Sequence, residues 1–312
     1  MRAAAILGLG TSESDLRAFG SGAATTWAEG LPSSAEEADA VVIFGGDGTV
    51  HRHLAALVRL QLPVLVVPSG SGNDFARALN LRSVGDSLKA WRGFEAGKVR
   101  PRAMDLGVIR PDASPGVARY FCCVAGCGLD AATARRANQM PRWLRGHGGY
   151  VLALLPALVR LPAYAIRIRR CNGPGEHRTG EDCSGERRTG EHHFDGPHFD
   201  EHREEARPTL LAAFANTQFF GDGMRIAPQA DASDGQLDIC RIGKMNAIEL
   251  AGMFPTVYFG RHLGSPSVEY WKDKRVRVES DVPLEIYADG EFVCETPAEI
   301  SVAPGALRVI AG

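Results

Sequence analysis

The 312-residue chain contains no long block of basic residues and no uninterrupted apolar run that could span a bilayer. Its 35 Lys and Arg residues nearly balance its 37 Asp and Glu residues, so the charge gives no indication of a nucleic-acid partner. A transmembrane helix needs about 18 or more consecutive apolar residues. The nearest approach, residues 150–161, is short and interrupted by proline, and we expect it to form a buried or interfacial helix.

Paired Cys-x-x-Cys motifs of the zinc-binding kind are also missing, and the seven cysteines are odd in number. Three of them, Cys122, Cys123 and Cys127, lie in or beside a stretch of small apolar residues. Such cysteines are typical of the reduced core of a cytosolic protein. Residues 1–10 are apolar but become polar too soon for a signal peptide. These features predict a cytoplasmic protein.

Two common nucleotide-binding signatures are absent as well. No lysine follows a glycine-rich turn in the phosphate-loop pattern, and residues 8–13 lack the third glycine of the dinucleotide fingerprint. The chain has instead two glycine-rich turns, GGDGT at 45–49 and SGSGND at 69–74, each directly after a β-prone run. Glycines admit close approach, and free N–H groups at a helix N-terminus favour anions, so both turns suit a polyphosphate. The structural alternative is a strand-to-helix turn in which an Asp or Asn caps the helix.

The first hundred residues alternate between strand and helix patterns, which predicts a parallel sheet covered by helices. Ligands bind beyond the carboxyl ends of such strands, so we expect the two turns to lie side by side at that edge. The expected strands are Ala4–Leu9, Ala40–Phe44 and Pro63–Val67, and the expected helices are Ser14–Phe19, Thr49–Leu60 and a helix beginning over Asp74–Leu79.

Beyond residue 102 the pattern changes to a succession of short strands separated by turns, which predicts an antiparallel sandwich or barrel. The expected strands are Asp105–Ile109, Ala118–Val124, Tyr164–Arg169, Thr209–Asn216, Gln236–Arg241, Arg275–Ser280, Leu284–Ala288, Ala298–Val302 and Leu307–Ile310. Helices are expected at Ala131–Asn138 and Ala247–His262.

Residues 171–208 are nearly devoid of aliphatic side chains and contain an imperfect duplication at 175–181 and 185–191. Such a segment cannot bury enough apolar surface to offset its ordering entropy, so we expect a mobile hairpin loop. Five of the nine histidines lie here, which leaves adventitious metal binding as a minor alternative.

Several ordered motifs give the chain a family resemblance. Their residues are Gly45–Val50 (GGDGTV), Pro68–Leu79 (PSGSGNDFARAL), Met104–Gly107 (MDLG), Tyr120–Asp130 (YFCCVAGCGLD), Ala227–Asp238 (APQADASDGQLD), Ala288–Glu291 (ADGE) and Pro304–Arg308 (PGALR). Taken together, they resemble the diacylglycerol kinase catalytic-domain family, which includes bacterial diacylglycerol kinases and sphingosine and ceramide kinases. Two departures stand out: Gly8–Ser12 replaces the family's Asn-Pro-x-Ser-Gly turn, and Ser71 replaces the usual threonine of the second turn.

The resemblance implies an α/β plus β fold. It implies an ATP-binding α/β domain over residues 1–104, to which a strand at about 304–312 returns. A mainly antiparallel β-sandwich over 105–303, with the flexible insert 171–208, would accept the lipid. The implied activity is transfer of the γ-phosphate of ATP, with Mg²⁺, to the hydroxyl of a lipid alcohol such as diacylglycerol or a sphingoid base. A protein of this kind would sit in the cytoplasm and touch the inner face of the membrane transiently; a homodimer is left open.

The resemblance also implies roles for particular residues. Nucleotide contacts fall on Gly45, Gly46, Asp47, Gly48, Thr49, Val50, His51, Ser71, Gly72 and Asn73 and, through a short local similarity, on Thr26. Glu291 would be the general base, with Asp289 and Asp47 as the other catalytic carboxylates. The structural alternative for Asp289–Glu291 is a simple Asp-Gly hairpin turn.

Carboxylates supply the expected metal sites. The family's aspartate network around the catalytic Mg²⁺ matches Asp47, Asp74 and Asp105. For Asp105 the structural alternative is a surface aspartate at the start of a strand. Hard oxygen ligands around a glycine turn at residues 231–238 suit Mg²⁺ or Ca²⁺. There the resemblance implies a structural Mg²⁺ held by Asp234 and by carbonyls near Asp231 and Gln236.

Two rival functions remain at this stage. One is a kinase for a soluble acceptor such as NAD, and the other is a nucleotide-binding regulator without catalysis, which the altered turn at residues 8–12 suggests. A lipid acceptor requires an apolar cleft. Met253, Phe254 and Val257 of the helix expected over 247–262 would line such a cleft or touch the bilayer, with core packing as the default.

Overall fold

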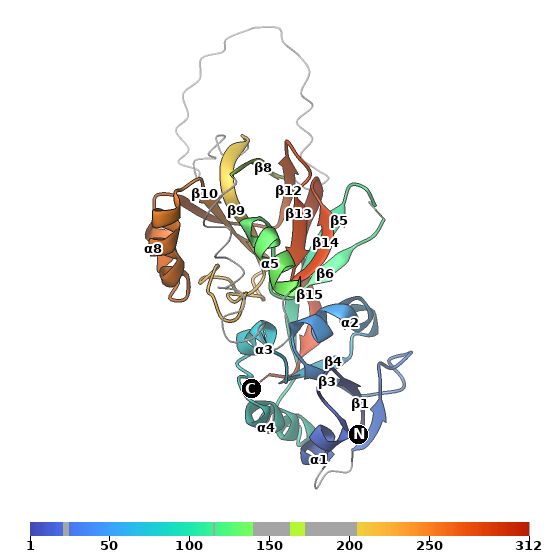
Figure 1. Ribbon diagram of the computed structural model, residues 1–312. Helices are drawn as coiled ribbons and strands as arrows, with labels where there is room; N and C mark the ends of the chain where they lie inside the picture. Colours follow the sequence, from blue (N-terminus) through green and yellow to red (C-terminus); the bar gives the residue numbers. More distant parts are fainter. Residues whose placement is uncertain (21–24, 115, 140–162, 172–204, 312) are drawn as a thin grey trace, which may run out of the picture.

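The computed structural model describes residues 1–20, 25–114, 116–139, 163–171 and 205–311 (Figure 1). The elements of the N-terminal half are β1 (Arg2–Leu7), α1 (Glu13–Gly20), β2 (Thr26–Glu29), β3 (Ala40–Gly45), α2 (Asp47–Leu60), β4 (Pro63–Pro68), α3 (Asp74–Ala78) and α4 (Val84–Glu95). Those of the C-terminal half are β5 (Arg102–Pro111), β6 (Arg119–Phe121), β7 (Val124–Gly128), α5 (Leu129–Gln139), β8 (Tyr164–Arg170), β9 (Arg207–Ala215), β10 (Leu237–Gly243), α8 (Ala247–Val257), the 3₁₀ turn η2 (Arg261–Gly264), β11 (Val268–Asp273), β12 (Arg275–Ser280), β13 (Glu285–Ala288), β14 (Glu291–Glu295) and β15 (Ala298–Val309).

The N-terminal half is built on a parallel sheet. Its strands lie in the order β4-β3-β1-β2, and each neighbouring pair is parallel. β3 is buried along its whole length, as expected for a parallel strand covered on both faces. The registers Phe44 to Val67 and Gly45 to Pro68 bring the carboxyl ends of β3 and β4 level. The two glycine-rich turns therefore start side by side at one edge of the sheet.

The C-terminal half is antiparallel and β-rich, and its strands continue the same hydrogen-bonded sheet in the order β14-β13-β7-β9-β8-β12-β15. β10 and β11 branch from β9, and β5 and β6 branch from β15. Its core includes Phe121, Ile166, Phe214, Ile239 and Val278. The expected α/β plus β fold class is confirmed.

One long strand, β15, joins the two halves. It pairs antiparallel with β5 and β12, and its last residues Arg308 and Val309 pair in parallel with β4. The sequence suggested two separate strands here, at 298–302 and 307–310. They form one strand because β5 pairs along nearly its whole length, and the register shift between Ala303 and Leu307 absorbs the Pro-Gly sequence as a bulge.

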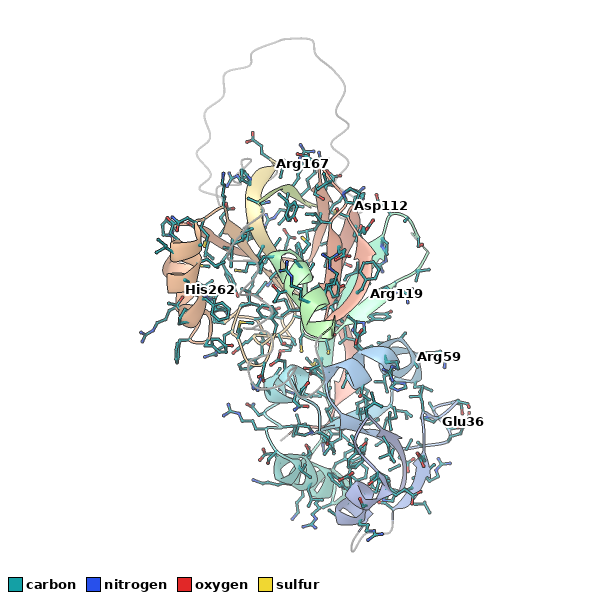
Figure 2. All side chains as sticks on the ribbon, viewed as in Figure 1. Glu36, Arg59, Asp112, Arg119, Arg167 and His262 are labelled. Atoms are coloured by element: carbon teal, nitrogen blue, oxygen red, sulfur yellow. The ribbon has the colours of Figure 1, made fainter. Side chains whose placement is uncertain are left out.

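Charged side chains lie around the outside of both halves. Figure 2 shows Glu36 and Arg59 on the N-terminal half, and Asp112 and Arg167 at the far end of the C-terminal half. His262, beside α8, is one of several buried exceptions: it is 1% exposed, and its Nε2 lies 3.0 Å from the carbonyl oxygen of Ile226.

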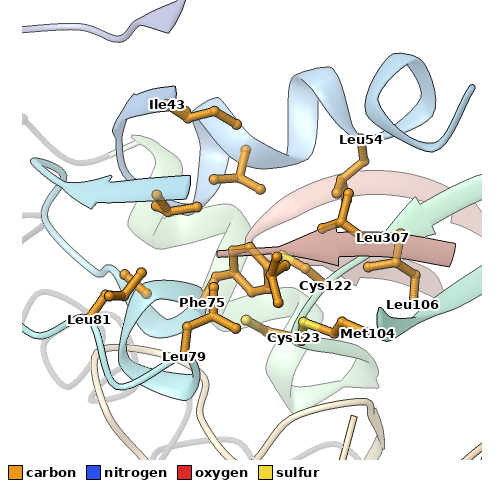
Figure 3. Packing of buried hydrophobic residues seen from close by; sticks show 14 of the residues in the cluster. Ile43, Leu54, Phe75, Leu79, Leu81, Met104, Leu106, Cys122, Cys123 and Leu307 are labelled. Atoms are coloured by element: carbon orange, nitrogen blue, oxygen red, sulfur yellow. The ribbon is translucent and has the colours of Figure 1, made fainter. Parts of the chain in front are cut away.

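The larger hydrophobic core crosses the boundary between the halves. Figure 3 shows Phe75 and Leu79 of the N-terminal half beside Met104, Cys122 and Cys123 of the C-terminal half. Burial of these side chains couples the two glycine-rich turns to the start of the β-rich half.

Some expectations need correction. The helix expected over Ala247–His262 ends at Val257, because Gly260 takes a left-handed φ of 67° and a 3₁₀ turn follows. The sequence patterns did not reveal β2, β11, β14 or α4. The expected segment 150–161 and residues 172–204 of the insert lie outside the described residues. Within the described part of the chain, no helix is long and apolar enough to cross a membrane.

Candidate functional site

The backbones of the two glycine-rich turns cross in close contact. A Cβ atom on Gly46 would lie 2.9 Å from Cα of Gly70, closer than real side chains approach. Only glycine fits this crossing, which explains why both turns carry it. Asn73 takes a left-handed φ of 55°, and its Oδ1 and Nδ2 bond to the N–H and carbonyl of Gly70, so its side chain shapes the turn and does not cap α3. Ser71, between Gly70 and Gly72, is exposed.

A third turn, after β1, lies against the first. A Cβ on Gly8 would be 2.7 Å from the carbonyl oxygen of Phe44 and 2.8 Å from Oγ1 of Thr49. Thr11 donates its hydroxyl to the carbonyl of Gly8 at 2.8 Å. The segment that departs from the family pattern thus still forms a tight turn next to residues 45–49. Val50, by contrast, is fully buried in the core, so only its backbone faces this edge.

Asp47 is half-buried at the crossing of the turns. Its two carboxylate oxygens accept from the N–H groups of Asp74 and Phe75, both at 2.9 Å, and so Asp47 caps the N-terminus of α3. Burial raises the pKa of Asp47, and the negative charge of Asp289 adds to this, against the lowering effect of the amide bonds and Arg77. A Cβ on Gly72 would lie 3.0 Å from Oδ2 of Asp47, which leaves this carboxylate closely covered.

Asp74 lies next to Asp47 and connects α3 to the C-terminal half. It forms an ion pair with Arg77 and accepts from the N–H groups of Asp222 and Gly223 at 3.0 and 2.8 Å. Burial, and then the charge of Asp47, raise the pKa of Asp74 to about 7. The charge of Asp47 thus disfavours the ionised form of its neighbour Asp74, and a carboxylate pair of this kind favours a nearby cation.

Asp105 holds two turns of the C-terminal half together. Its carboxylate accepts from Gly305 at 2.7 Å and from Gly235 at 2.8 Å. At 4% exposure it is not the surface residue of the structural alternative. Among the described residues, no contact links the Asp105 carboxylate to that of Asp47, so the two do not form one cluster.

Asp289 is the most enclosed carboxylate of the site, with a side chain that is 0% exposed. It accepts from the backbone N–H groups of Cys122 and Cys123, both at 2.8 Å, and its Oδ2 lies 3.2 Å from Nδ1 of His51 on α2. Burial would raise the pKa of Asp289, but the bond to His51, its charge and the two amides lower it. For His51, burial lowers the pKa, while the hydrogen bond and charge of Asp289 and the charge of Glu291 outweigh it and raise the pKa.

Glu291 begins β14 on the other side of the Asp-Gly turn, and its side chain reaches the first phosphate-type turn. A Cβ on Gly48 would lie 3.3 Å from Oε1 of Glu291. The turn itself is a tight hairpin in which Asp289 and Gly290 take φ values of 50° and 85°. The segment is therefore the Asp-Gly hairpin turn of the structural alternative. That same turn points Asp289 inward and brings Glu291 next to Gly48.

The acidic turn at 231–238 is a separate feature. Oδ1 of Asp231 accepts from Ser233, and Oδ1 of Asp234 accepts from the N–H of Gln236 at 2.9 Å. Oδ2 of Asp234 is bound by the ammonium of Lys272 at 2.6 Å. Asp238 pairs locally by accepting from the hydroxyl of Tyr270 at 2.6 Å.

Lys272 bears on whether this turn fits a divalent ion. Its Nζ also lies 3.5 Å from the carbonyl oxygen of Gln229 and 3.6 Å from Oδ2 of Asp238. An ammonium among these oxygens already supplies a positive charge, so the donor set fits a divalent ion poorly while Lys272 keeps this position. Asp47 and Asp74, whose charges are only partly balanced by Arg77, fit Mg²⁺ better.

Thr26 is the nucleotide candidate that the structure does not bring to the site. It begins β2 opposite Arg2, and its N–H donates to the carbonyl of Met1. The registers set Thr26 level with residue 39, six residues before Gly45, which corresponds to about 20 Å along the strand.

Two further residues contact the residues of the site but were not identified from the sequence. Arg77 pairs with Asp74 and lies 5.8 Å from the centre of the Phe219 ring. Asn216, 1% exposed, donates to the carbonyls of Asp105 and Cys122 at 2.8 and 3.0 Å. Arg77 stands inside the second motif, three residues after Asp74, so helical spacing could have suggested its pairing. Nothing local marks Asn216.

Comparison with known proteins gives the class to which this fold and site belong. Residues 5–109 match the diacylglycerol kinase catalytic domain, and residues 123–311 match the YegS C-terminal NAD kinase beta sandwich-like domain. The chain is 33% identical over 276 residues to a diacylglycerol kinase of Mycobacterium tuberculosis, covering 88% of this chain and 78% of that protein. It is 27% identical over 283 residues to a diacylglycerol kinase of Bacillus subtilis, covering 88% and 80%.

Solved structures agree on the fold. The crystal structure of a diacylglycerol kinase from Bacillus anthracis superposes with a TM-score of 0.63 at 15% identity, covering 100% of this chain and 97% of that one. Another structure from the same organism reaches a TM-score of 0.70 at 17% identity, covering 100% and 95%. The chain belongs to the diacylglycerol kinase catalytic-domain family. Membership of this kinase family implies a phosphotransferase that uses ATP.

Proposed function

We propose that the protein transfers the γ-phosphate of ATP, supplied with Mg²⁺ as its substrate complex, to the hydroxyl of a lipid alcohol such as diacylglycerol or a sphingoid base. The observation that carries this proposal is the approach of Glu291 to Gly48, which joins a carboxylate of the β-rich half to a phosphate-type turn of the α/β half. The kinase names of the relatives support the same reaction class.

The backbone of the crossed turns suits the ATP phosphates. The N–H groups at the start of α2 and the helix dipole favour negative charge, and the Gly46–Gly70 crossing leaves no side chain in the way. Thr49 and Ser71 add hydroxyls on two sides. Residues 45–49 and 71–73 are the nucleotide residues of this proposal, with His51 acting through Asp289.

Glu291 is the proposed general base for the lipid hydroxyl. It is exposed toward solvent, as a group that must meet a second substrate has to be. Asp289, fixed by two amides and His51, holds the turn that carries Glu291. Mg²⁺ would neutralise charge on the transferring phosphoryl group, and the carboxylates of Asp47 and Asp74 are the residues that would hold it. A positioned base contributes roughly 10²–10⁴-fold to rate.

An apolar cavity supports a lipid acceptor. It lies between α8, β9, β10 and the segment 220–226, and Met253, Phe254 and Val257 line it together with Leu129, at the start of α5. Its volume of about 40 Å³ is too small for an acyl chain. We therefore propose that α8 moves outward to admit the acyl chain. The side chains that line the cavity are all apolar, which suits such a chain.

The same region supports transient contact with a membrane. Ile248 on α8 is 86% exposed and Phe259 just after α8 is 73% exposed, which is unusual for large apolar side chains. Such residues would insert shallowly beside the cavity. On this proposal the protein is cytoplasmic and meets its acceptor at the inner face of the membrane.

Labelled-ATP transfer to a panel of acceptors tests the proposal. The panel contains diacylglycerol, monoacylglycerol, a sphingoid base and ceramide in mixed micelles, and NAD without detergent. We expect a lipid to be phosphorylated, and we expect Glu291→Gln to lower kcat at least 100-fold. Glu295→Gln, at the exposed far end of the same strand, is the matched control and should retain wild-type rates.

Two results would overturn the assignment. Phosphorylation of NAD alone would establish a soluble-acceptor kinase, and ATP binding without transfer to any acceptor would establish a regulator. The acceptor site has its own test: Met253→Trp fills the cavity and should raise KM for lipid with little change in KM for ATP. Ala251→Trp, on the exposed face of α8, controls for the added bulk.

A further inference from the structure

A cluster of metal-ligating side chains surrounds Oδ2 of Asp289, and the proposed phosphoryl transfer uses only part of it. The ligand atoms of Cys122, Cys123 and Asp289 all lie within 4.8 Å of one another. Nδ1 of His51 is 3.2 Å from the same carboxylate oxygen. The adjacent cysteines have no role in the transfer beyond the backbone N–H groups that hold Asp289.

We propose that His51, Cys122, Cys123 and Asp289 form a binding site for a soft divalent cation such as Zn²⁺ or Cd²⁺. Two sulfurs, one imidazole nitrogen and one carboxylate oxygen are a donor set typical of tetrahedral zinc. Thiolates select soft cations and disfavour Mg²⁺, so this site is chemically separate from any Mg²⁺ that accompanies ATP.

The hydrogen bonds of the cluster mark where the cation would sit. The thiol of Cys122 donates to Oδ2 of Asp289 at 3.2 Å, and the ring of His51 meets the same oxygen at the same distance. Bond lengths of about 2.1–2.3 Å at tetrahedral angles give ligand separations of about 3.4–3.8 Å. The two measured separations, both to Oδ2 of Asp289, are near that range. His51 stands outside the group of ligand atoms that lie within 4.8 Å of one another, so His51 and the cysteines must move closer together when the cation binds.

Binding balances in protons and charge. The cation replaces the thiol protons of Cys122 and Cys123 and the Nδ1 proton of the His51 imidazolium, so three H⁺ leave and His51 binds as neutral imidazole through Nδ1. With the carboxylate of Asp289 the complex carries one net negative charge. The amide bonds from Cys122 and Cys123 to Asp289 can persist, because each carboxylate oxygen has a second lone pair.

Among the described residues of the cluster, His51 marks the side that is open to solvent. Cys122 and Cys123 are 0% and 3% exposed and Asp289 is closed, whereas the His51 side chain is 18% exposed. This opening lies on α2 immediately behind the turn at residues 45–49. If the proposed function holds, a cation bound here would replace the direct contact between His51 and Asp289 that helps hold the turn carrying Glu291, and would therefore inhibit transfer.

Titration of the metal-free, reduced full-length protein with Co²⁺ tests the binding site. Thiolate ligands give Co²⁺ a near-ultraviolet charge-transfer band that histidine and carboxylate ligands alone do not, so the histidines of the segment 171–208 cannot produce it by themselves. We expect the band in wild type, its loss in Cys122→Ser/Cys123→Ser, and its displacement by stoichiometric Zn²⁺. Cys171→Ser/Cys183→Ser removes the two cysteines in that segment and should leave the band intact.

Absence of the band in wild type, or its persistence in Cys122→Ser/Cys123→Ser, would overturn the proposal and leave these cysteines as core residues only. ¹¹³Cd NMR of wild type reports the number of thiolate ligands without relying on any variant, and a shift for fewer than two sulfurs would also overturn it. Inhibition is measured separately. The factor by which Zn²⁺ lowers the transfer rate should be at least 10-fold smaller in the double variant than in wild type. A protein without transferase activity would refute the proposed function while the Co²⁺ band still decided the site.

Discussion

Nδ1 of His51 and Oδ2 of Asp289 lie 3.2 Å apart, and this contact ties a helix of the α/β half to the hairpin turn of the β-rich half. The histidine is on α2, two residues after Thr49, and the aspartate is 238 residues further along the chain. Each side chain shifts the pKa of the other, upward for His51 and downward for Asp289, which favours the ionised pair.

His51→Gln should destabilise the protein by about 2 kcal/mol near pH 6, the usual contribution of a hydrogen bond to a charged group. The pKa of His51 is raised in the folded state, so its contribution is fully present below the unfolded value of about 6.5 and is lost as pH rises through the folded value. The difference between wild type and variant, measured by chemical denaturation, should therefore shrink toward pH 9.

His53→Gln on the same helix is the control for that experiment. Burial, and then Arg52, lower the pKa of His53, so its effect on stability has the opposite sign with pH. Replacing His53 should help most at low pH. If both variants respond to pH alike, the ionised pair with Asp289 does not contribute as described.

Asp74 should make the stability of the ligand-free protein fall as pH rises toward neutrality. Its pKa of about 7 lies above that of an unfolded aspartate, so the folded state retains a proton that the unfolded state has released. The slope can reach about 1.4 kcal/mol per pH unit between pH 4 and 7. Asp74→Asn should flatten this slope, and 10 mM MgCl₂ should stabilise wild type more at pH 8 than at pH 5.5.

Gly70→Ala should disrupt the crossing of the two phosphate-type turns. The new methyl group would meet the backbone of Gly46, so we expect a loss of about 1–3 kcal/mol and a raised KM for ATP. Gly252→Ala, inside α8 with open space around it, should instead stabilise by about 0.5–1 kcal/mol. Thermal unfolding and ATP kinetics measure both, and an unchanged KM for ATP in Gly70→Ala would argue against these turns as the nucleotide site.

Lys272→Met should make the acidic turn dependent on an added cation. Without the ammonium, Asp234 and Asp238 lose their positive neighbour, and we expect the midpoint of thermal unfolding to fall by several degrees in EDTA and to recover in MgCl₂. Wild type should be insensitive to this exchange. Lys274→Met, exposed on the same segment, should behave as wild type. Stabilisation of wild type by Mg²⁺ with no ATP present would favour a structural metal at Asp234.

The sequence predicted the parts of the fold that depend on local pattern. Buried strands such as β3 and β4 are continuous apolar runs, and two such strands in parallel bring the turns that follow them to one edge. β2 and β14 were missed because most of their residues are exposed and lack a clear alternation. α4 did carry a signal, since Ser83 and Asp86 form a capping box with Asp in place of Glu or Gln.

The contacts inside the site could not be predicted in the same way. That Asp47 caps α3, or that the amides of Cys122 and Cys123 hold Asp289, depends on pairs of residues 27 to 167 positions apart. No local pattern encodes which donor a carboxylate will meet across such a distance. The motif resemblance pointed to these carboxylates but said nothing of their hydrogen-bond partners, and a short local similarity added Thr26, which lies at the opposite end of the sheet.

The strand β15 has a consequence for biosynthesis. β4, which ends at Pro68, has one edge that is covered only when Arg308 and Val309 pair with it. A ribosome adding about 5–20 residues per second needs on the order of 10–50 s to make the intervening chain. Throughout that time the nascent α/β half exposes an apolar parallel strand, an open edge that invites pairing with other chains. Deletion of residues 307–312 removes the partner of this edge of β4. The shortened protein should therefore aggregate during synthesis, and its N-terminal half should not be recovered in soluble form.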